Sequence, residues 1–152
     1  MKVFRRQSPL RKKASKKTRP NAKPAIFVRK VRGMGRGVFA GKDFRKGETI
    51  EICPVILLPR RQERKCVGEV LEKYIFHWPK NGHVAAIALG YGSIYNHSHE
   101  PNARFSPRFR SGDVVFKASR DIKAGEQIFV DYEWHHSDYD FPAKPLGHQL
   151  SE

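Results

Sequence analysis

The sequence is poor in cysteine and has no long hydrophobic run. Cys53 and Cys66 are its only two cysteines among 152 residues, and their spacing matches no metal-ligand pattern. A disulfide-rich or zinc-finger protein is therefore excluded, and a reducing compartment is favoured over secretion. No apolar segment has the length of a secretory signal or of a membrane span. We expect neither export nor membrane insertion.

Acidic residues are absent from the first 24 positions, which hold ten Lys and Arg residues. This stretch contributes +10 to a net charge of +15, so residues 25–152 contribute only +5, from 20 basic and 15 acidic residues. We interpret residues 1–24 as a disordered basic arm. Such an arm attracts polyanions of any sequence because counterions are released. Nucleic acid is one candidate partner, and a solvated tail that raises solubility is the alternative.

The rest of the chain is long enough for one domain with a modest core, since 39% of the sequence is apolar. Short apolar and β-branched runs predict strands at residues 26–28, 38–40, 49–58, 84–89, 113–118 and 127–130. Residues 59–65 are interpreted as a surface loop because five of the seven are charged. Strands outnumber helices, so the predicted fold class is mostly β with a short helical insert.

One amphipathic helix is predicted between residue 67 and Pro79. Helical spacing relates five apolar residues, Val67, Val70, Leu71, Tyr74 and Ile75. Pro79 would end the helix at the latest, because proline lacks the backbone donor that a helix needs.

One pattern occurs twice. Residues 40–50 and 118–128 both match A-x-x-D-apolar-x-x-G-E-x-I. We interpret both as strand–turn–strand corners, in which the aspartate bonds to the local backbone and the glycine takes a positive φ. The middle apolar residue would fill the core. Two similar corners predict two similar small sheets.

Three glycines lie close together in Gly33-Met34-Gly35-Arg36-Gly37. A dinucleotide-binding loop would need a strand before it and a helix after it, whereas residues 38–40 continue as a strand. Two interpretations remain. The segment is either a glycine bulge between strands or a place where the backbone approaches a ligand closely, because glycine has no Cβ.

Three short motifs follow one another along the chain. Gly35-Arg36-Gly37-Val38-Phe39-Ala40 comes first, Asn96-His97-Ser98 with Pro101-Asn102 second, and Gly125-Glu126 through Asp131-Tyr132 third. In this order they resemble the motifs of SET-domain protein-lysine methyltransferases. The resemblance covers residues 25–135, and the short chain is most similar to the minimal SET proteins of viruses and bacteria. It implies a SET fold of several small β-sheets with a C-terminal pseudoknot, and a flanking segment at residues 136–152.

The resemblance also implies roles for individual residues. The backbone of Gly35-Arg36-Gly37 would hold the methionine end of S-adenosylmethionine, which is the implied cofactor. Asn96 would bind the amino-acid end of that cofactor, and His97 would contact its adenine through the main chain. Tyr132 would be the catalytic tyrosine, with its hydroxyl near the transferring methyl group. The pseudoknot would bring Asn96 and Tyr132 together.

Methyl transfer from a sulfonium to an amine is an in-line displacement, which needs alignment and a neutral lysine amine rather than a nucleophile triad. Free lysine has a pKa of about 10.4. An apolar, aromatic channel lowers that pKa because burial penalises the ammonium. The candidates for lining the channel are Tyr91, Tyr95, Phe105 and Tyr132. Core packing remains an equal alternative for Tyr95 and Phe105.

The sequence departs from the family pattern near its end. Val130 stands where many members have an aromatic residue that influences the number of methyl groups added, so product multiplicity is open. No cysteine follows Tyr132, so the zinc-bound segment that closes the channel in many members is absent. Trp134, Tyr139 or Phe141 would close it instead, and each also fits an ordinary tail aromatic.

No metal site is predicted. The nearest candidate is His135-His136 with Asp138, but adjacent histidine side chains point apart and no second ligand cluster exists. His99 stands where many members of the family have cysteine, which removes one further ligand.

The sequence thus predicts an S-adenosylmethionine-dependent enzyme that methylates lysine in a basic protein, such as a histone, a histone-like protein or a ribosomal protein. Two alternatives are a basic nucleic-acid-binding protein without catalysis and a SET-fold binder that has lost activity. Retention of Asn96 and Tyr132 argues against the latter. The compartment would be the bacterial cytoplasm, or the nucleus and chromatin of a eukaryote. The oligomeric state is open, with a homodimer as one option.

Substrate recognition is predicted less sharply. Residues 124–143 contain five acidic residues and no Lys or Arg: Glu126, Asp131, Glu133, Asp138 and Asp140. Such a patch would suit a Lys/Arg-rich peptide, and a solvated acidic face is the alternative. The arm itself is a further candidate substrate, through Lys12, Lys13, Lys16 or Lys17.

Overall fold

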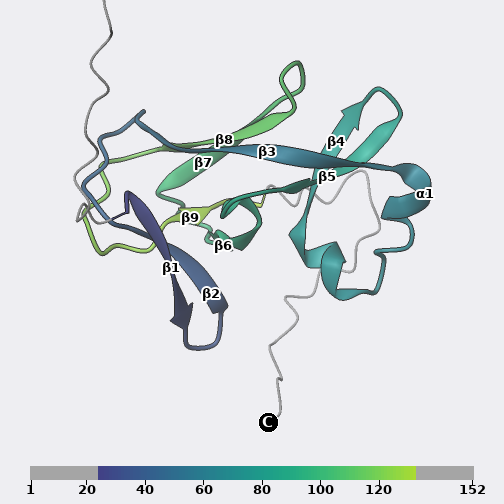
Figure 1. Ribbon diagram of the computed structural model, residues 1–152. Coiled ribbons are helices and arrows are strands. Elements are labelled where there is room, and N and C mark those ends of the chain that lie inside the picture. The colour runs from purple at the N-terminus through teal and green to yellow at the C-terminus, as the bar shows by residue number, and fades with distance from the viewer. Residues whose placement is uncertain (1–23, 133–152) are drawn as a thin grey trace, which may run out of the picture.

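The computed structural model describes residues 24–132 (Figure 1). In this range the strands are β1 Ile26–Val31, β2 Gly35–Ala40, β3 Thr49–Pro59, β4 Ile75–Lys80, β5 His83–Ala88, β6 Asn96–His97, β7 Ala103–Arg108, β8 Asp113–Ala118 and β9 Phe129–Val130. The helical segments are α1 Arg60–Glu63 and the 3-10 turns η1 Val70–Tyr74 and η2 Gly92–Ile94. The predicted fold class, mostly β with several small sheets, is confirmed. The predicted arm and the C-terminal flanking segment lie outside the described residues.

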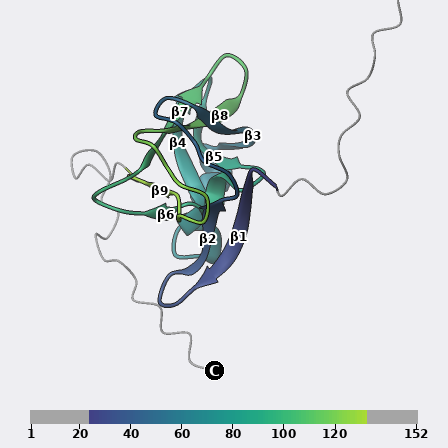
Figure 2. The same cartoon turned by 90° about the vertical axis from the view of Figure 1, so that its left-hand side faces the viewer.

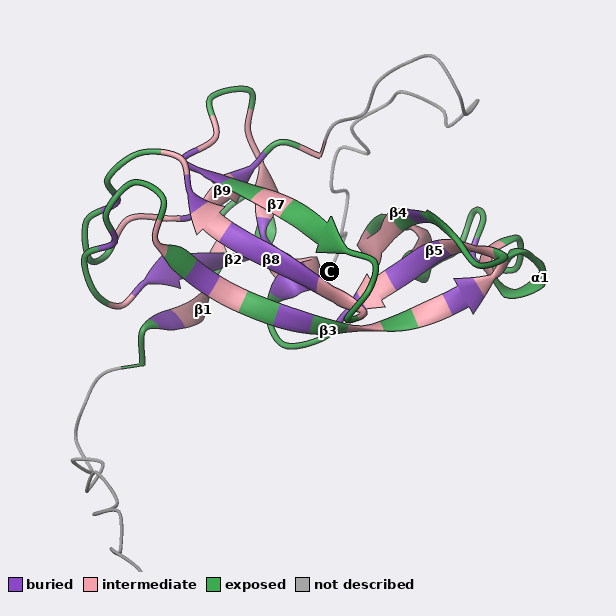
Figure 3. Cartoon of the chain, turned by 90° about the horizontal axis from the view of Figure 1, so that it is seen from above, coloured by how far each residue is buried: buried purple, intermediate pink, exposed green. Residues whose placement is uncertain are grey.

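Three sheets make up this part of the chain. β1 and β2 form an antiparallel hairpin, and β6 pairs with β9 in parallel. The largest sheet has the order β4-β5-β3-β8-β7. Its central strand β3 pairs with β8 through its first half and with β5 through its second half, and Figure 3 shows it running the length of the molecule. β3 therefore joins two hairpins into one framework.

The large sheet buries one face around an aromatic cluster. Phe76 of edge strand β4 meets Phe105 of the opposite edge strand β7 with ring centroids 5.2 Å apart. Both rings also lie near Phe116 of β8. Contact between the two edges means that the sheet curls, as strongly twisted sheets do. On β3 the alternation of side chains turns Cys53 inward and leaves Ile52 half exposed on the other face.

The two repeated segments pair with each other. Phe44 and Ile122 exchange backbone hydrogen bonds of 2.9 Å in both directions and are buried, so their predicted place in the core is confirmed. Gly47 and Gly125 have φ of 85° and 92°, which confirms the predicted positive φ. The amide of Gly47 donates to the Ala118 carbonyl at 2.8 Å, and that of Gly125 donates to the Ala40 carbonyl at 2.7 Å.

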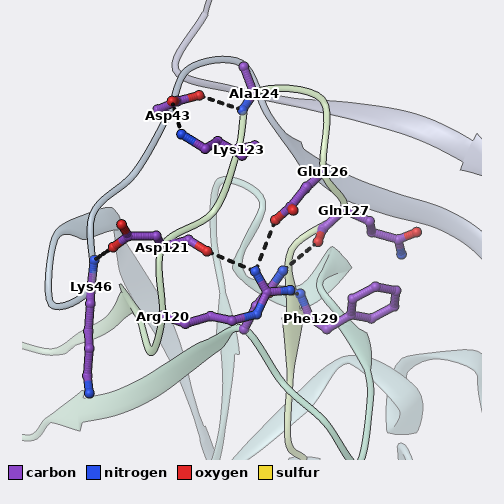
Figure 4. Close-up of polar contacts among 10 residues, drawn as sticks. Asp43, Lys46, Arg120, Asp121, Lys123, Ala124, Glu126, Gln127 and Phe129 are labelled. Carbon is purple, nitrogen blue, oxygen red and sulfur yellow. Dashed lines mark hydrogen bonds and ion pairs between the residues drawn. The ribbon is translucent and has the colours of Figure 1, made fainter.

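The aspartates of the two segments do not bond locally, so that prediction is wrong. Asp43 accepts a hydrogen bond of 2.9 Å from the amide of Ala124, and Asp121 accepts one of 2.8 Å from the amide of Lys46 (Figure 4). Each aspartate caps the turn of the other segment, because the reciprocal pairing places the two turns side by side. The expected two similar sheets are also wrong, since both segments enter this single contact.

The predicted helix between residue 67 and Pro79 is wrong as well. Val67, Val70 and Leu71 are 58%, 71% and 51% exposed, so their spacing buries no common face. Only the short turn η1 forms, and Ile75 begins β4 opposite Ile87 of β5. Strand pairing is available to Ile75 and buries it better than an isolated helix would.

Two strands that contain proline were not predicted from the sequence. Pro79 lies in β4 and Pro107 in β7, which are the two edges of the large sheet. Edge strands tolerate proline because their outer amides have no partner in the sheet. The residues predicted as a loop at 59–65 contain the short helix α1, which begins directly after Pro59.

Candidate active site

The second and third motifs meet through the parallel pairing of β6 and β9. Asn96 lies opposite Phe129 and His97 opposite Val130. The strands have only two residues each, yet they bring segments far apart in sequence side by side (Figure 2). This is the meeting of Asn96 with the Tyr132 segment that was expected. The threading of the chain through a loop stays a prediction.

Asn102 fixes the position of β9. It is 2% exposed, and its side-chain amide makes two hydrogen bonds of 2.8 Å, from Nδ2 to the Gln127 carbonyl and from the Phe129 amide to Oδ1. A primary amide can donate and accept at once, so one side chain satisfies two backbone groups that the short strand leaves open. Asn102 belongs to the second motif, and the sequence alone indicated no role for it.

Tyr132 lies two residues after the end of β9. Its hydroxyl donates to the Tyr95 carbonyl at 2.6 Å, and its amide donates to Nδ1 of His97 at 3.2 Å. Burial raises the pKa of the Tyr132 hydroxyl, with a smaller contribution from Tyr74, so the phenol keeps its proton at neutral pH. Nδ1 of His97 also lies 3.6 Å from Oδ1 of Asp131.

The first motif reaches the same place through Gly37. A Cβ on this residue would lie 2.6 Å from Nε2 of Gln127 and 2.8 Å from Nδ2 of Asn96. Both amide nitrogens are buried, and within the described residues neither has a hydrogen-bond partner. Buried donors without acceptors are costly. Two of them converging beside a glycine fit the carboxylate of an amino-acid group. Gln127 is a further candidate site residue; it lies within the third motif, and the sequence alone indicated no role for it.

Gly35 and Arg36 of the first motif begin β2, directly after the turn of the β1–β2 hairpin. Gly35 has φ of 73° and is exposed, and Arg36 is exposed beside it. The strand continues directly into the buried residues of β2, so the glycines permit both the tight turn and the close approach at Gly37. The register of β1 and β2 is continuous through Gly35 and Gly37, so the glycine-bulge interpretation is wrong, and close approach of this segment to a ligand stays a prediction.

The candidate channel residues differ in their surroundings. Tyr95 is 2% exposed, and its ring stacks on Phe116 at 4.3 Å. Phe105 is partly buried in the same aromatic cluster. Tyr91 is 37% exposed. Tyr95 and Phe105 therefore take part in the core, which was the alternative interpretation for both, and their role in a channel stays a prediction.

Glu51 connects two of these tyrosines. Its carboxylate accepts hydrogen bonds of 3.0 Å from the Tyr95 hydroxyl and from the Tyr91 amide. Burial, and then the charge of Glu51, raise the pKa of Tyr95. A Cβ on Gly90 would lie 2.5 Å from this carboxylate, so the glycine leaves room for it. Glu51 lies on β3, 44 residues before Tyr95 in the sequence. No local sequence pattern could therefore have indicated this contact.

Several predicted residues cannot be placed. Trp134, Tyr139, Phe141 and the His135-His136 pair lie outside the described residues. Among residues 24–132 no three potential metal ligands lie together. The helices described there are all too short to cross a membrane.

These observations define a mostly β protein in which three motifs converge on one site, and the comparison with known families agrees. The family model of the SET domain matches residues 35–133, and the chain belongs to this family. It is a protein-lysine N-methyltransferase whose cofactor is S-adenosylmethionine. The predictions of the family, the enzyme class and the cofactor are confirmed.

Similar proteins support this assignment. The histone-lysine N-methyltransferase of Schizosaccharomyces pombe specific for H3 lysine-37 is 29% identical over 117 residues, which cover 76% of this chain and 78% of that protein. A crystal structure of a Plasmodium falciparum protein assigned as a histone methyltransferase has a TM-score of 0.57 and 29% identity, and the match covers 74% of this chain and 95% of that one.

A more distant structure supports the fold alone. Polycomb Repressive Complex 2 of Chaetomium thermophilum, in an autoinhibited conformation bound to S-adenosylmethionine, has a TM-score of 0.57 at 22% identity. The match covers 74% of this chain and 15% of that one.

Proposed function

We propose that this enzyme methylates a lysine of a histone or of a similarly basic protein, with Tyr132 as the catalytic tyrosine. Gly35-Arg36-Gly37, Asn96 and His97 would hold the cofactor, and Tyr91, Tyr95 and Phe105 would line the lysine channel. The observation that carries this proposal is the pair of unpaired amide nitrogens, on Asn96 and Gln127, beside Gly37.

The amide donors explain how the amino-acid end of the cofactor is held. Asn96 Nδ2 and Gln127 Nε2 donate to a carboxylate, which replaces the hydration that both lost on burial. Gly37 has no side chain to obstruct that contact. Asn102 holds the backbone around Gln127 and thereby keeps one of the donors in position.

Tyr132 positions the reacting groups. When bound, S-adenosylmethionine supplies an electrophilic methyl group on a sulfonium. The Tyr132 hydroxyl donates its hydrogen bond to the Tyr95 carbonyl, so its lone pairs remain available to accept an N–H of the substrate amine. Its raised pKa keeps the phenol neutral. An apolar surrounding also lowers the pKa of the substrate lysine, so that the amine reaches the site without its proton.

The substrate class rests on the relatives. The fission yeast relative acts on histone H3, and the Plasmodium protein is assigned to histones. Both are matched over most of their length, at 78% and 95%. Histones are basic proteins, which agrees with the substrate class expected from the sequence. In a eukaryotic host this substrate would place the enzyme in the nucleus.

The test is transfer of label from S-adenosylmethionine to purified histones, with ribosomal proteins as the alternative substrate. Tyr132→Phe is expected to lower kcat about 100-fold or more while cofactor affinity changes little, because alignment is lost and binding is not. Tyr74→Phe is the matched control, since it removes a nearby phenol that the site does not use. Label transfer that survives in Tyr132→Phe contradicts the assigned role. Labelling of ribosomal proteins but of no histone contradicts the substrate.

A further inference from the structure

The net charge of the chain lies entirely in its first 42 residues. They contain 15 of the 30 Lys and Arg residues and none of the 15 Asp and Glu residues, so residues 43–152 hold 15 of each and have no net charge. The segment without acidic residues extends beyond the predicted arm, which ends at residue 24. Residues 25–42 of it include the β1–β2 hairpin, which belongs to the folded domain.

The hairpin presents its cations at one end. Arg29, Lys30, Arg32 and Arg36 are all exposed, and they surround the turn between β1 and β2. The hairpin projects from the large sheet in both side views (Figures 1 and 2). Its opposite end is apolar and packs into the core through Ile26, Val38 and Ala40. The charged end is therefore supported by a rigid base.

These cations lack the neutralisation found elsewhere in the fold. Lys42, Arg120 and Lys123 pair with Glu48, Glu126 and Asp43. Among residues 24–132 no ion pair includes any of the four hairpin cations. Lys30 and Arg36 even lie directly opposite each other across the two strands. Like charges in such a pair destabilise a sheet, so the arrangement opposes folding and favours an external anion.

We propose that the β1–β2 hairpin is a docking surface for the phosphate backbone of duplex DNA. A basic substrate peptide is repelled by this surface, so the hairpin does not receive the substrate itself. DNA wrapped around histones is a polyanion that accompanies the proposed substrate. This step rests on the proposed histone substrate. Contacts to phosphate position a protein without reading sequence.

The hairpin also joins this surface to the active site. Gly37, which leaves room for the amides of Asn96 and Gln127, lies on β2 one residue after Arg36 and directly opposite Arg29. A duplex held at the turn is thus held next to the site. A lysine of the histone that this duplex wraps then reaches the site at high effective concentration.

The test measures binding of a mixed-sequence duplex to the full chain by fluorescence anisotropy between 50 and 200 mM salt. The variant Lys30→Gln/Arg32→Gln removes two cations without touching Gly35-Arg36-Gly37. It is expected to bind at least about fivefold more weakly, and the slope of log K against log salt is expected to fall by about 2. Arg64→Gln/Lys65→Gln removes the same charge at the α1 end of the molecule and is expected to change affinity less than about twofold.

Several outcomes would overturn the inference. One is an equal loss of affinity and slope in the hairpin variant and the α1 variant, because charge alone would then explain binding. Tighter binding of single-stranded RNA, or of vesicles of anionic phospholipid, than of the duplex would assign the surface to another partner. The variant Lys30→Arg/Arg32→Lys must restore binding, since phosphate contacts accept either cation.

Methyl transfer separates this inference from the proposed function. The hairpin variant is expected to raise KM for DNA-wrapped histones at least about fivefold, in step with its loss of duplex affinity. Its kcat/KM for the free histone peptide is expected to be no lower than that of the unaltered protein, because fewer cations repel the peptide. Undiminished activity on the peptide also shows that the variant is folded. If the unaltered protein labels no histone, the proposed function fails. If peptide labelling is normal and the hairpin variant binds duplex as tightly as the unaltered protein, only the docking surface fails.

Discussion

A buried side-chain donor normally has an acceptor, because each donor lost its hydration when the chain folded. Asn96 Nδ2 and Gln127 Nε2 are exceptions within the described residues, and both lie beside Gly37. Such a cost is retained where a ligand later supplies the acceptor. The unpaired amides are therefore the feature that supports the proposed cofactor site at the level of single atoms.

Asn96→Ala tests this distinction. We expect the Kd for S-adenosylmethionine, measured by calorimetry, to rise at least about tenfold, because one charge-assisted hydrogen bond is lost. Without cofactor the free energy of unfolding is expected to stay within about 1 kcal/mol, since removal of an unpaired buried donor also removes its desolvation cost. Ser98→Ala is the control, as its hydroxyl accepts only from the exposed Glu100 amide. A large loss of stability with unchanged Kd would mean that Asn96 is structural.

Asn102→Ala is expected to act through the backbone of β9. The change leaves the Gln127 carbonyl and the Phe129 amide without their partner, at about 1–3 kcal/mol for each buried group. Urea unfolding measures this loss. Activity at low temperature, where the variant is still folded, should also fall, because Gln127 and Tyr132 flank β9. A variant as stable as the unaltered protein would show that Asn102 does not fix this segment.

Two fully buried groups, Cys53 and Tyr95, together with the partly buried Tyr132, give the fold a dependence on alkaline pH. Burial raises the pKa of the Cys53 thiol to about 12, and burial also raises the pKa of Tyr95. In the unfolded chain a thiol ionises near pH 8.5 and a phenol near about 10. The folded state then holds protons that the unfolded state has released, so the stability is complete below these values and falls as pH rises.

We expect the free energy of unfolding to fall above about pH 9, by up to about 1.4 kcal/mol per pH unit for each such group. Cys53→Ala removes the thiol and should delay the onset to about pH 10, where tyrosine ionises. Urea unfolding between pH 7.5 and 11 measures both curves. Identical slopes from pH 8.5 to 10 in the two proteins would contradict the role of Cys53.

At the level of elements, the reciprocal corners close the domain. Phe44 and Ile122 lie at the centre of this contact and are 2% and 0% exposed. Phe44→Ala is expected to lower the free energy of unfolding by about 3–5 kcal/mol, because a large cavity remains. Val70→Ala is the matched control and should stay within about 0.5 kcal/mol, since Val70 is 71% exposed on η1. A comparable loss at both positions would restore the amphipathic helix that the spacing of residues 67–75 suggested.

Elements with a local sequence signal were predicted, and those that depend on distant partners were not. Strands with continuous β-branched runs, such as β3 and β8, were predicted within a residue or two because their signal is local. The helix at residues 67–75 failed because spacing alone does not provide a face to bury it against. The aspartates of the corners were recognised, but their partners were not, since a partner 75 to 81 residues away leaves no local trace.

In the candidate site, too, residues in short motifs were predicted, and residues that depend on distant contacts were not. Tyr132, Asn96 and the glycines were identified through short motifs, and the structure brings those motifs together. Glu51 and the role of Gln127 were missed, because each depends on a contact between distant segments: Glu51 with Tyr95, and Gln127 with Gly37. Sequence therefore indicated the chemistry, whereas tertiary structure was needed to find the residues that position it.

For the whole molecule, the decisive property is the separation of charge. All of the excess charge of +15 lies in residues 1–42, whereas Tyr132, the proposed catalytic tyrosine, lies in the neutral remainder. Glu126 near the site pairs with Arg120, which reduces the acidic patch expected from the sequence. The long-range field of the protein is therefore positive towards any approaching substrate, while local acidic residues act only at short distance.

This field predicts opposite effects of salt on two forms of the substrate. With a free basic peptide, kcat/KM should rise as salt increases from 10 to 100 mM, because the Debye length shortens from about 30 Å to about 10 Å and repulsion is screened. With DNA-wrapped histones it should fall, because attraction to phosphate weakens. Replacing Lys12, Lys13, Lys16 and Lys17 by glutamine in the full chain should reduce both dependences. A rate on the free peptide that falls with salt would instead mean that carboxylates near the site, such as Asp131, dominate the encounter.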